Sequence, residues 1–236
     1  MMRKLLIGSL LALIVLSVNS NLMAQKIGAK AGINISRISY SGDGDLVEMA
    51  KDNMAALTST TFGIYLNYKL IPLLSLQIEG NYDPRGNKFD ANYFGYLFPE
   101  AIKNSTSTIS FDGEISEKLN YLTFPVLLKA NLAFFHVEAG PYIGFLLNAK
   151  QITKGSATVD GQAVSYDKEV DSKDNFKSTD FGIAAGAGMT FNLGPAQLMA
   201  GARYMMGMTN ILKESTGDAT AKHQVITIYA GIAIGL

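Results

Sequence analysis

Strict alternation of apolar and polar residues in eight segments is the feature that most constrains how this chain folds. The longest segment, residues 134–150, places Phe135 and Val137 on one face and His136 and Glu138 on the other. A period of two is typical of β-strands, and this segment is far longer than the usual strand of about 5–6 residues. The predicted strands are 26–35, 60–70, 73–82, 117–130, 134–150, 180–193, 196–208 and 223–236.

The connections between the predicted strands alternate between short and long. The short links are residues 71–72, 131–133 and 194–195, and the long ones are 36–59, 83–116, 151–179 and 209–222. All short turns therefore lie at one end of the sheet and all long loops at the other, as in outer-membrane barrels with periplasmic turns and external loops. A tilted membrane strand needs about 9–11 residues, which accounts for the unusual strand length.

The polar face of the strands separates a membrane barrel from a soluble lipocalin-type barrel, which also alternates. A soluble barrel turns this face to water and carries many Lys and Glu residues on it. Here the face is mostly Gly, Asn, Ser, Thr and Tyr, as in Gly63, Tyr65 and Asn67, which suits a narrow lumen filled by side chains. An open sheet in lipid would leave its edge amides without partners. We therefore predict an all-β, eight-stranded antiparallel up-and-down transmembrane β-barrel, whose apolar face contacts lipid of the bacterial outer membrane.

The N-terminal residues have the pattern of a secretory signal peptide. Arg3 and Lys4 precede an apolar segment at 5–18, and the small residue Ala24 precedes Gln25. The apolar run is short and polar residues follow it, which favours a signal peptide over a membrane-anchor helix. The predicted organisation is a signal peptide at 1–24 and an outer-membrane β-barrel domain at 25–236.

Four charged residues lie at positions of the predicted strands whose side chains are expected to point into the barrel. Lys30, Glu79, Glu138 and Arg203 each lie four to seven residues beyond the start of a predicted strand, so we expect them at a similar depth in the lumen. Two acids and two bases in a narrow, poorly hydrated space are expected to pair, because an unpaired buried charge is very costly. The main interpretation is a structural plug of salt bridges. The alternative is a proton or ion path, or a narrow pore that conducts or takes up a small ligand.

Other chemistries find little support in the sequence. The chain has no cysteine and a formal net charge of zero, which excludes thiolate chemistry and gives no indication of a nucleic-acid partner. No G-x-S-x-G elbow, H-E-x-x-H helix or P-loop is present. His223, five residues after Asp218, is weak evidence for a hydrolase at the rim, and a solvated loop histidine is the preferred interpretation. We predict no catalytic residues, metal or cofactor, and thus not an enzyme.

The long loops contain three further patterns. Residues 45–57 have apolar positions spaced as in a short amphipathic helix that caps the barrel mouth. Residues 92–102 contain an aromatic cluster that binds a partner protein or rests against the barrel or the outer leaflet. Within 154–180, GSATVDGQAVSY is compatible with a hairpin above the membrane. The residues of the possible partner-binding loop are Tyr93, Phe94, Tyr96 and Phe98.

Several segments together resemble the PorT-like outer-membrane β-barrel family of Bacteroidetes-type bacteria. They are KIGAKAGIN, LSLQIEGNY, LNYLTFPVLLKA, VEAGPYIGFLLNAK, STDFGIAAGAGM and the stretch from Arg203 to Asn210, and they span nearly all of 26–236. The resemblance implies an eight-stranded barrel in the outer membrane. It does not imply one function, because most relatives have no assigned activity. The founding member is tied to type IX protein secretion, which suggests a link to protein secretion or envelope assembly through a partner protein. This functional link is an analogy at the level of the family.

Overall fold

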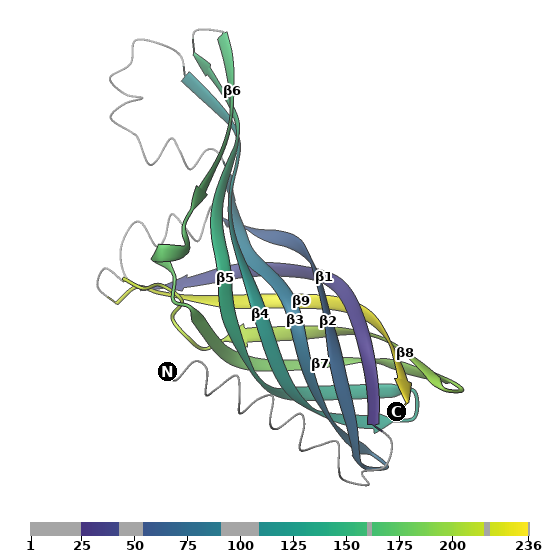
Figure 1. Cartoon of the computed structure of the whole chain (residues 1–236). Helices are drawn as coiled ribbons and strands as arrows, with labels where there is room; N and C mark the ends of the chain where they lie inside the picture. The colour runs from purple at the N-terminus through teal and green to yellow at the C-terminus, as the bar shows by residue number, and fades with distance from the viewer. Residues whose placement is uncertain (1–24, 43–53, 91–108, 160–161, 215–217, 236) are drawn as a thin grey trace.

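The computed structural model describes residues 25–42, 54–90, 109–159, 162–214 and 218–235 (Figure 1). Nine strands and one short 3₁₀ helix, η2 (Lys173–Asn175), make up the described part of the chain. No helix in this part is long and apolar enough to cross a membrane. The strands are β1 (Gln25–Ser41), β2 (Met54–Ile71), β3 (Leu74–Asp90), β4 (Ile109–Leu132), β5 (Phe135–Val159), β6 (Gln162–Asp171), β7 (Thr179–Leu193), β8 (Ala196–Gly207) and β9 (Thr220–Gly235).

Eight of the strands close into the predicted antiparallel barrel. The hydrogen-bonded order runs β4-β3-β2-β1-β9-β8-β7-β5, and the pairing of β4 with β5 completes the ring. Short links join β2 to β3, β4 to β5 and β7 to β8, as the sequence predicts. The first and last strands pair antiparallel over their length, so β1 begins and β9 ends at the turn end of the barrel (Figure 1).

The ninth strand lies outside the ring. β6 pairs with the distal part of β5, from Lys150 opposite Asp171 to Val159 opposite Gln162. The barrel contact of β5 with β7 uses a different stretch, Phe135 to Phe145. β4, β5 and β6 therefore continue beyond the barrel wall as a projecting sheet (Figure 1). This is the hairpin that GSATVDGQAVSY suggested, and it is longer than the sequence pattern indicated.

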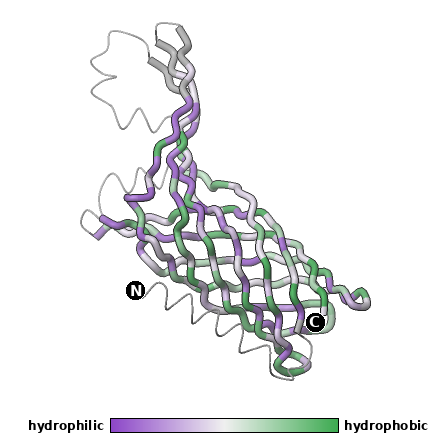
Figure 2. The backbone as a smooth tube through the Cα atoms, in the orientation of Figure 1, coloured by the Kyte–Doolittle hydropathy of each residue, from purple (hydrophilic) through white to green (hydrophobic). Residues whose placement is uncertain are grey.

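The two faces of the barrel wall have inverted polarity relative to a soluble protein. Large apolar side chains point outward and are exposed, for example Phe62 at 58% and Ile64 at 65%. The inward face is buried and largely polar, and hydrophobic and hydrophilic residues alternate along the barrel strands (Figure 2). A continuous exposed apolar surface on a closed sheet is the arrangement that lipid requires.

The structure corrects the helix predicted at 45–57, and some predicted segments lie outside the described residues. The helix expected at 45–57 is wrong for its last four residues, because Met54 to Leu57 belong to β2 and Met54 lies opposite Phe89 on β3. Strand pairing supplies their backbone hydrogen bonds and overrides the helical spacing. Residues 45–53 of that segment, the aromatic residues 92–102 and the predicted signal peptide lie outside the described residues.

Candidate functional site in the barrel lumen

The four predicted charged residues meet inside the barrel. The guanidinium of Arg203 donates to both oxygens of Glu79, at 2.7 and 2.8 Å, and to Oε1 of Glu138, at 2.6 and 2.8 Å. Lys30 Nζ lies 2.5 Å from Glu79 Oε2. All four side chains are nearly inaccessible to solvent. Each carboxylate is thus held by charged donors, which offsets the large cost of removing it from water.

A fifth charged residue, Lys129 on β4, completes this lower charge layer. Its Nζ lies 3.5 Å from Glu138 Oε2 and donates to Gln77 Oε1 at 3.1 Å. Gln77 in turn donates to Glu79 Oε1 at 2.5 Å. Three cations and two anions give the lower layer a formal charge of +1.

Aromatic and histidine side chains extend the lower layer toward the turn end. The hydroxyl of Tyr229 donates to Glu138 Oε1 at 3.1 Å, and Lys30 and Arg203 lie 5.0 and 5.3 Å from the centre of its ring. His136 Nε2 is 3.4 Å from the same hydroxyl. Cations over an aromatic face gain a further electrostatic attraction.

A second cluster, the upper charge layer, lies nearer the loop end. Arg85 on β3 pairs with Asp83 at 2.7 Å and with Asp180 on β7 at 2.8 Å. The hydroxyl of Tyr142 donates to Asp180 at 3.0 Å, and Asn34 donates to Asp83 at 2.5 Å. One cation and two anions give this layer a formal charge of −1, so the two layers together are neutral.

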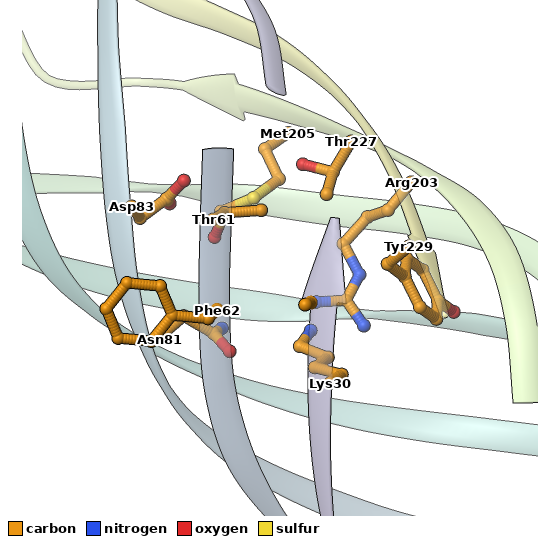
Figure 3. Close-up of a pocket in the computed structure, with 10 residues that line it drawn as sticks. Lys30, Thr61, Phe62, Asn81, Asp83, Arg203, Met205, Thr227 and Tyr229 are labelled. Carbon is orange, nitrogen blue, oxygen red and sulfur yellow. The ribbon is translucent and has the colours of Figure 1, made fainter. Parts of the chain in front are cut away.

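A small cavity separates the two layers (Figure 3). Lys30 and Arg203 line it from the lower layer and Asp83 from the upper one, with Asn81 and Tyr229 beside them. The volume of this cavity that is open to the centre of a water molecule is about 10 Å³. That is room for about one water molecule.

Above the upper layer, apolar side chains close the barrel mouth. Phe176, which follows η2, and Ile211, between β8 and β9, are buried against Ile38, Leu119 and neighbouring strand residues. An isolated bridge between Phe176 and Leu212 joins the two connections. The lumen is therefore filled by two charge layers and covered by an apolar cap.

The structure corrects the interpretation of His223. Its side chain is fully buried on β9, with Nε2 3.3 Å from the Tyr121 hydroxyl, whereas Asp218 is exposed. The predicted solvated loop histidine is wrong because β9 starts at Thr220 and this position faces the lumen. Within the described residues, no group of three or more His, Cys, Asp or Glu residues could hold a metal ion.

Asp83 and Arg85 were missed because the predicted third strand ended at residue 82. The signal was nevertheless present, since Glu79, Asn81, Asp83, Arg85 and Asn87 form one polar series with a period of two. Pro84 obscured it, because proline is unusual inside a sheet. In β3 the carbonyl of Pro84 accepts from Ser59 and Asn34 side chains, and the strand continues.

Comparison with known proteins agrees with this architecture. The model of the family described as outer membrane protein beta-barrel domain matches residues 23–213, well over half of the chain. The chain belongs to this family. It is an outer-membrane β-barrel protein, located in the bacterial outer membrane. A search of curated proteins gives no match.

Several solved outer-membrane proteins are similar to this outer-membrane barrel over most of their length. Ail, the attachment invasion locus protein of Yersinia pestis, is 15% identical with a TM-score of 0.37, covering 90% of this chain and 100% of its own. OprG from Pseudomonas aeruginosa is 14% identical with a TM-score of 0.42, covering 90% and 96%. The outer membrane protease OmpT from Escherichia coli is 7% identical with a TM-score of 0.39, covering 92% and 98%.

Proposed function

We propose that this protein is a closed, non-enzymatic outer-membrane barrel that presents its projecting strands to a partner protein. The observation that carries the proposal is the filled lumen. The eight charged side chains of the two layers are buried and each is ion-paired, and the space between the two layers holds about one water. The eight are Lys30, Glu79, Asp83, Arg85, Lys129, Glu138, Asp180 and Arg203.

The projecting sheet is the part of the described chain best suited to contact a partner. Among the described residues β6 pairs only with β5, so its other edge is open to a further strand. Lys168, Glu169 and Val170 on β6 are exposed. An open edge binds an extended segment through main-chain hydrogen bonds, while charged side chains on it oppose indiscriminate pairing. The predicted aromatic loop, Tyr93, Phe94, Tyr96 and Phe98, is proposed as a second contact.

The partner is proposed to belong to the secretion or envelope-assembly machinery. The support is the resemblance of the strand segments to PorT-like barrels, which is an analogy and needs its own test. The alternative is a narrow pore or a small-ligand uptake barrel. Its support is the cavity between the charge layers, but an ion crossing the lumen would have to displace both layers and the apolar cap.

Two measurements on the refolded protein without residues 1–24 test the proposal. The first is single-channel conductance in planar bilayers, for which we expect no steady current. The second is partner capture from envelope extracts by the parent and by a variant in which a two-residue turn replaces 155–166. We expect the parent, and not the shortened variant, to retain a specific protein. A reproducible current that changes in the Glu79→Gln, Glu138→Gln variant would contradict the closed barrel and favour the pore.

A further inference from the structure

A ladder of apolar pairs covers the outer face of β1 and β9. Five successive outward pairs face each other directly across these strands. They are Ile27 with Ile234, Ala29 with Ile232, Ala31 with Ala230, Ile33 with Ile228 and Ile35 with Ile226. The ladder spans positions 27–35 of β1, about the length with which a tilted strand crosses the hydrocarbon.

The polarity changes abruptly in the next two outward rows toward the loop end. Arg37 lies opposite Gln224, and Ser39 lies opposite Lys222. Arg37 and Lys222 are therefore diagonal neighbours on the same outer face, a separation of roughly 7–8 Å in an antiparallel pair. Both side chains are exposed, and neither forms an ion pair with another described residue.

We propose that Arg37, Lys222 and Gln224 bind the phosphate group of an anionic lipid in the outer leaflet. The site is continuous with the lipid-facing ladder, so a lipid whose acyl chains lie against Ile35 and Ile226 has its headgroup at these three side chains. A guanidinium presents two parallel N–H donors that match phosphate oxygens, and an ammonium adds a point charge. Basic side chains next to an apolar surface attract anionic headgroups.

Other exposed lysines in the described part of the chain provide a contrast. Lys150 pairs with Glu169, and Lys154 lies 3.5 Å from Asp167. Both lie on the stretch of β5 that pairs with β6, beyond the stretch that pairs with β7. Their charge is already balanced by carboxylates on the adjacent strand. They form a matched control of equal charge.

The test is native mass spectrometry of the folded protein, released from detergent micelles that contain bisphosphorylated lipid A. We expect the parent to retain the lipid. The Arg37→Gln, Lys222→Gln variant should retain it roughly 30-fold more weakly, since each basic residue near an anionic surface contributes on the order of 1 kcal/mol. The Lys150→Gln, Lys154→Gln variant should retain it like the parent, and lipid A stripped of both phosphates should bind poorly to all three proteins.

Three results would overturn the proposal. Equal retention by the parent and the Arg37→Gln, Lys222→Gln variant would show that these side chains do not bind the lipid. An equal loss of lipid retention in the Lys150→Gln, Lys154→Gln variant would show that retention depends only on the total charge of the protein. Undiminished retention of dephosphorylated lipid A would show that the acyl chains alone are recognised. Far-UV circular dichroism of each variant establishes that it is folded before retention is compared.

Discussion

The guanidinium of Arg203 on β8 forms a bidentate contact with the carboxylate of Glu79 on β3. Three strands separate β3 from β8 in either direction around the ring, so this pair connects opposite walls of the barrel. Arg203 also holds Glu138 on β5. One side chain thus joins three walls across the lumen, which makes it the centre of the plug.

We expect Arg203→Met to be among the most destabilising substitutions in the barrel. It keeps an unbranched side chain but leaves Glu79 and Glu138 buried with fewer compensating charges. Removing one partner of a buried ion pair costs about 3–5 kcal/mol. The measurement is the free energy of unfolding from urea titration in phospholipid vesicles, followed by far-UV circular dichroism because the chain has no tryptophan.

The exposed pair of Lys150 and Glu169 supplies the control for Arg203→Met. We expect Lys150→Met to leave the free energy of unfolding nearly unchanged, as is usual for surface ion pairs. Similar losses for the two variants would mean that the luminal network contributes no more than a surface contact, and the plug interpretation would fail.

The formal charge of +1 in the lower layer gives a second prediction. Lys129→Met leaves Lys30 and Arg203 against Glu79 and Glu138, which is a balanced set. We therefore expect it to cost less than Arg203→Met, because Glu138 keeps its hydrogen bonds from Arg203 and Tyr229 and is not left without a charged partner. The same urea titration measures it. A loss as large as that of Arg203→Met would show that the number of contacts, not charge balance, governs the lumen.

The membrane part of this fold could be predicted from the sequence because lipid imposes a simple rule on it. Every second residue from Ile27 to Ile35 must be apolar to face lipid, and the lumen must be polar or small. The same rule placed Lys30, Glu79, Glu138 and Arg203 in one phase, and the structure brings them together.

The rule fails where the strands leave the membrane. β3 from Asp83 onward carries polar residues on both faces and has no alternation of apolar and polar residues. β4 before Glu117 does alternate, but this stretch lies within the predicted loop 83–116. β6 is harder still to predict from the sequence, because its pairing with β5 includes charged contacts such as Lys154 with Asp167. The upper charge layer was missed for the first of these reasons, since Arg85 lies in that part of β3.

Gly86 on β3 is a position where only glycine fits. Its φ is +154°, and a Cβ there would lie 1.8 Å from the carbonyl oxygen of Glu117 on β4. The hydroxyl of Ser36 also contacts both its N–H and its carbonyl, at 2.9 and 3.0 Å. We expect Gly86→Ala to lower the free energy of unfolding by at least about 1–3 kcal/mol through strain and overpacking.

Gly235, near the end of β9, is the control for that substitution. A Cβ at Gly235 would meet no atom within 4 Å, so Gly235→Ala should leave the urea midpoint unchanged. If Gly86→Ala behaved the same way, β3 and β4 would have to separate at this point without cost. That result would contradict the continuous pairing of Gly86 with Lys118.

The projecting hairpin is expected to be energetically independent of the barrel. β6 contacts β5 only beyond Lys150, whereas barrel closure uses β5 from Phe135 to Phe145. Replacing 155–166 by a two-residue turn should therefore leave the thermal midpoint in vesicles within a few degrees of the parent, corresponding to about 1 kcal/mol or less. Replacing Phe176 by Ala, by contrast, removes a buried ring from the mouth cap and should cost about 3–5 kcal/mol. If shortening the hairpin lowered the midpoint as much as Phe176→Ala, the projecting strands would be part of the barrel's stabilising core, and partner binding could not be tested by removing them.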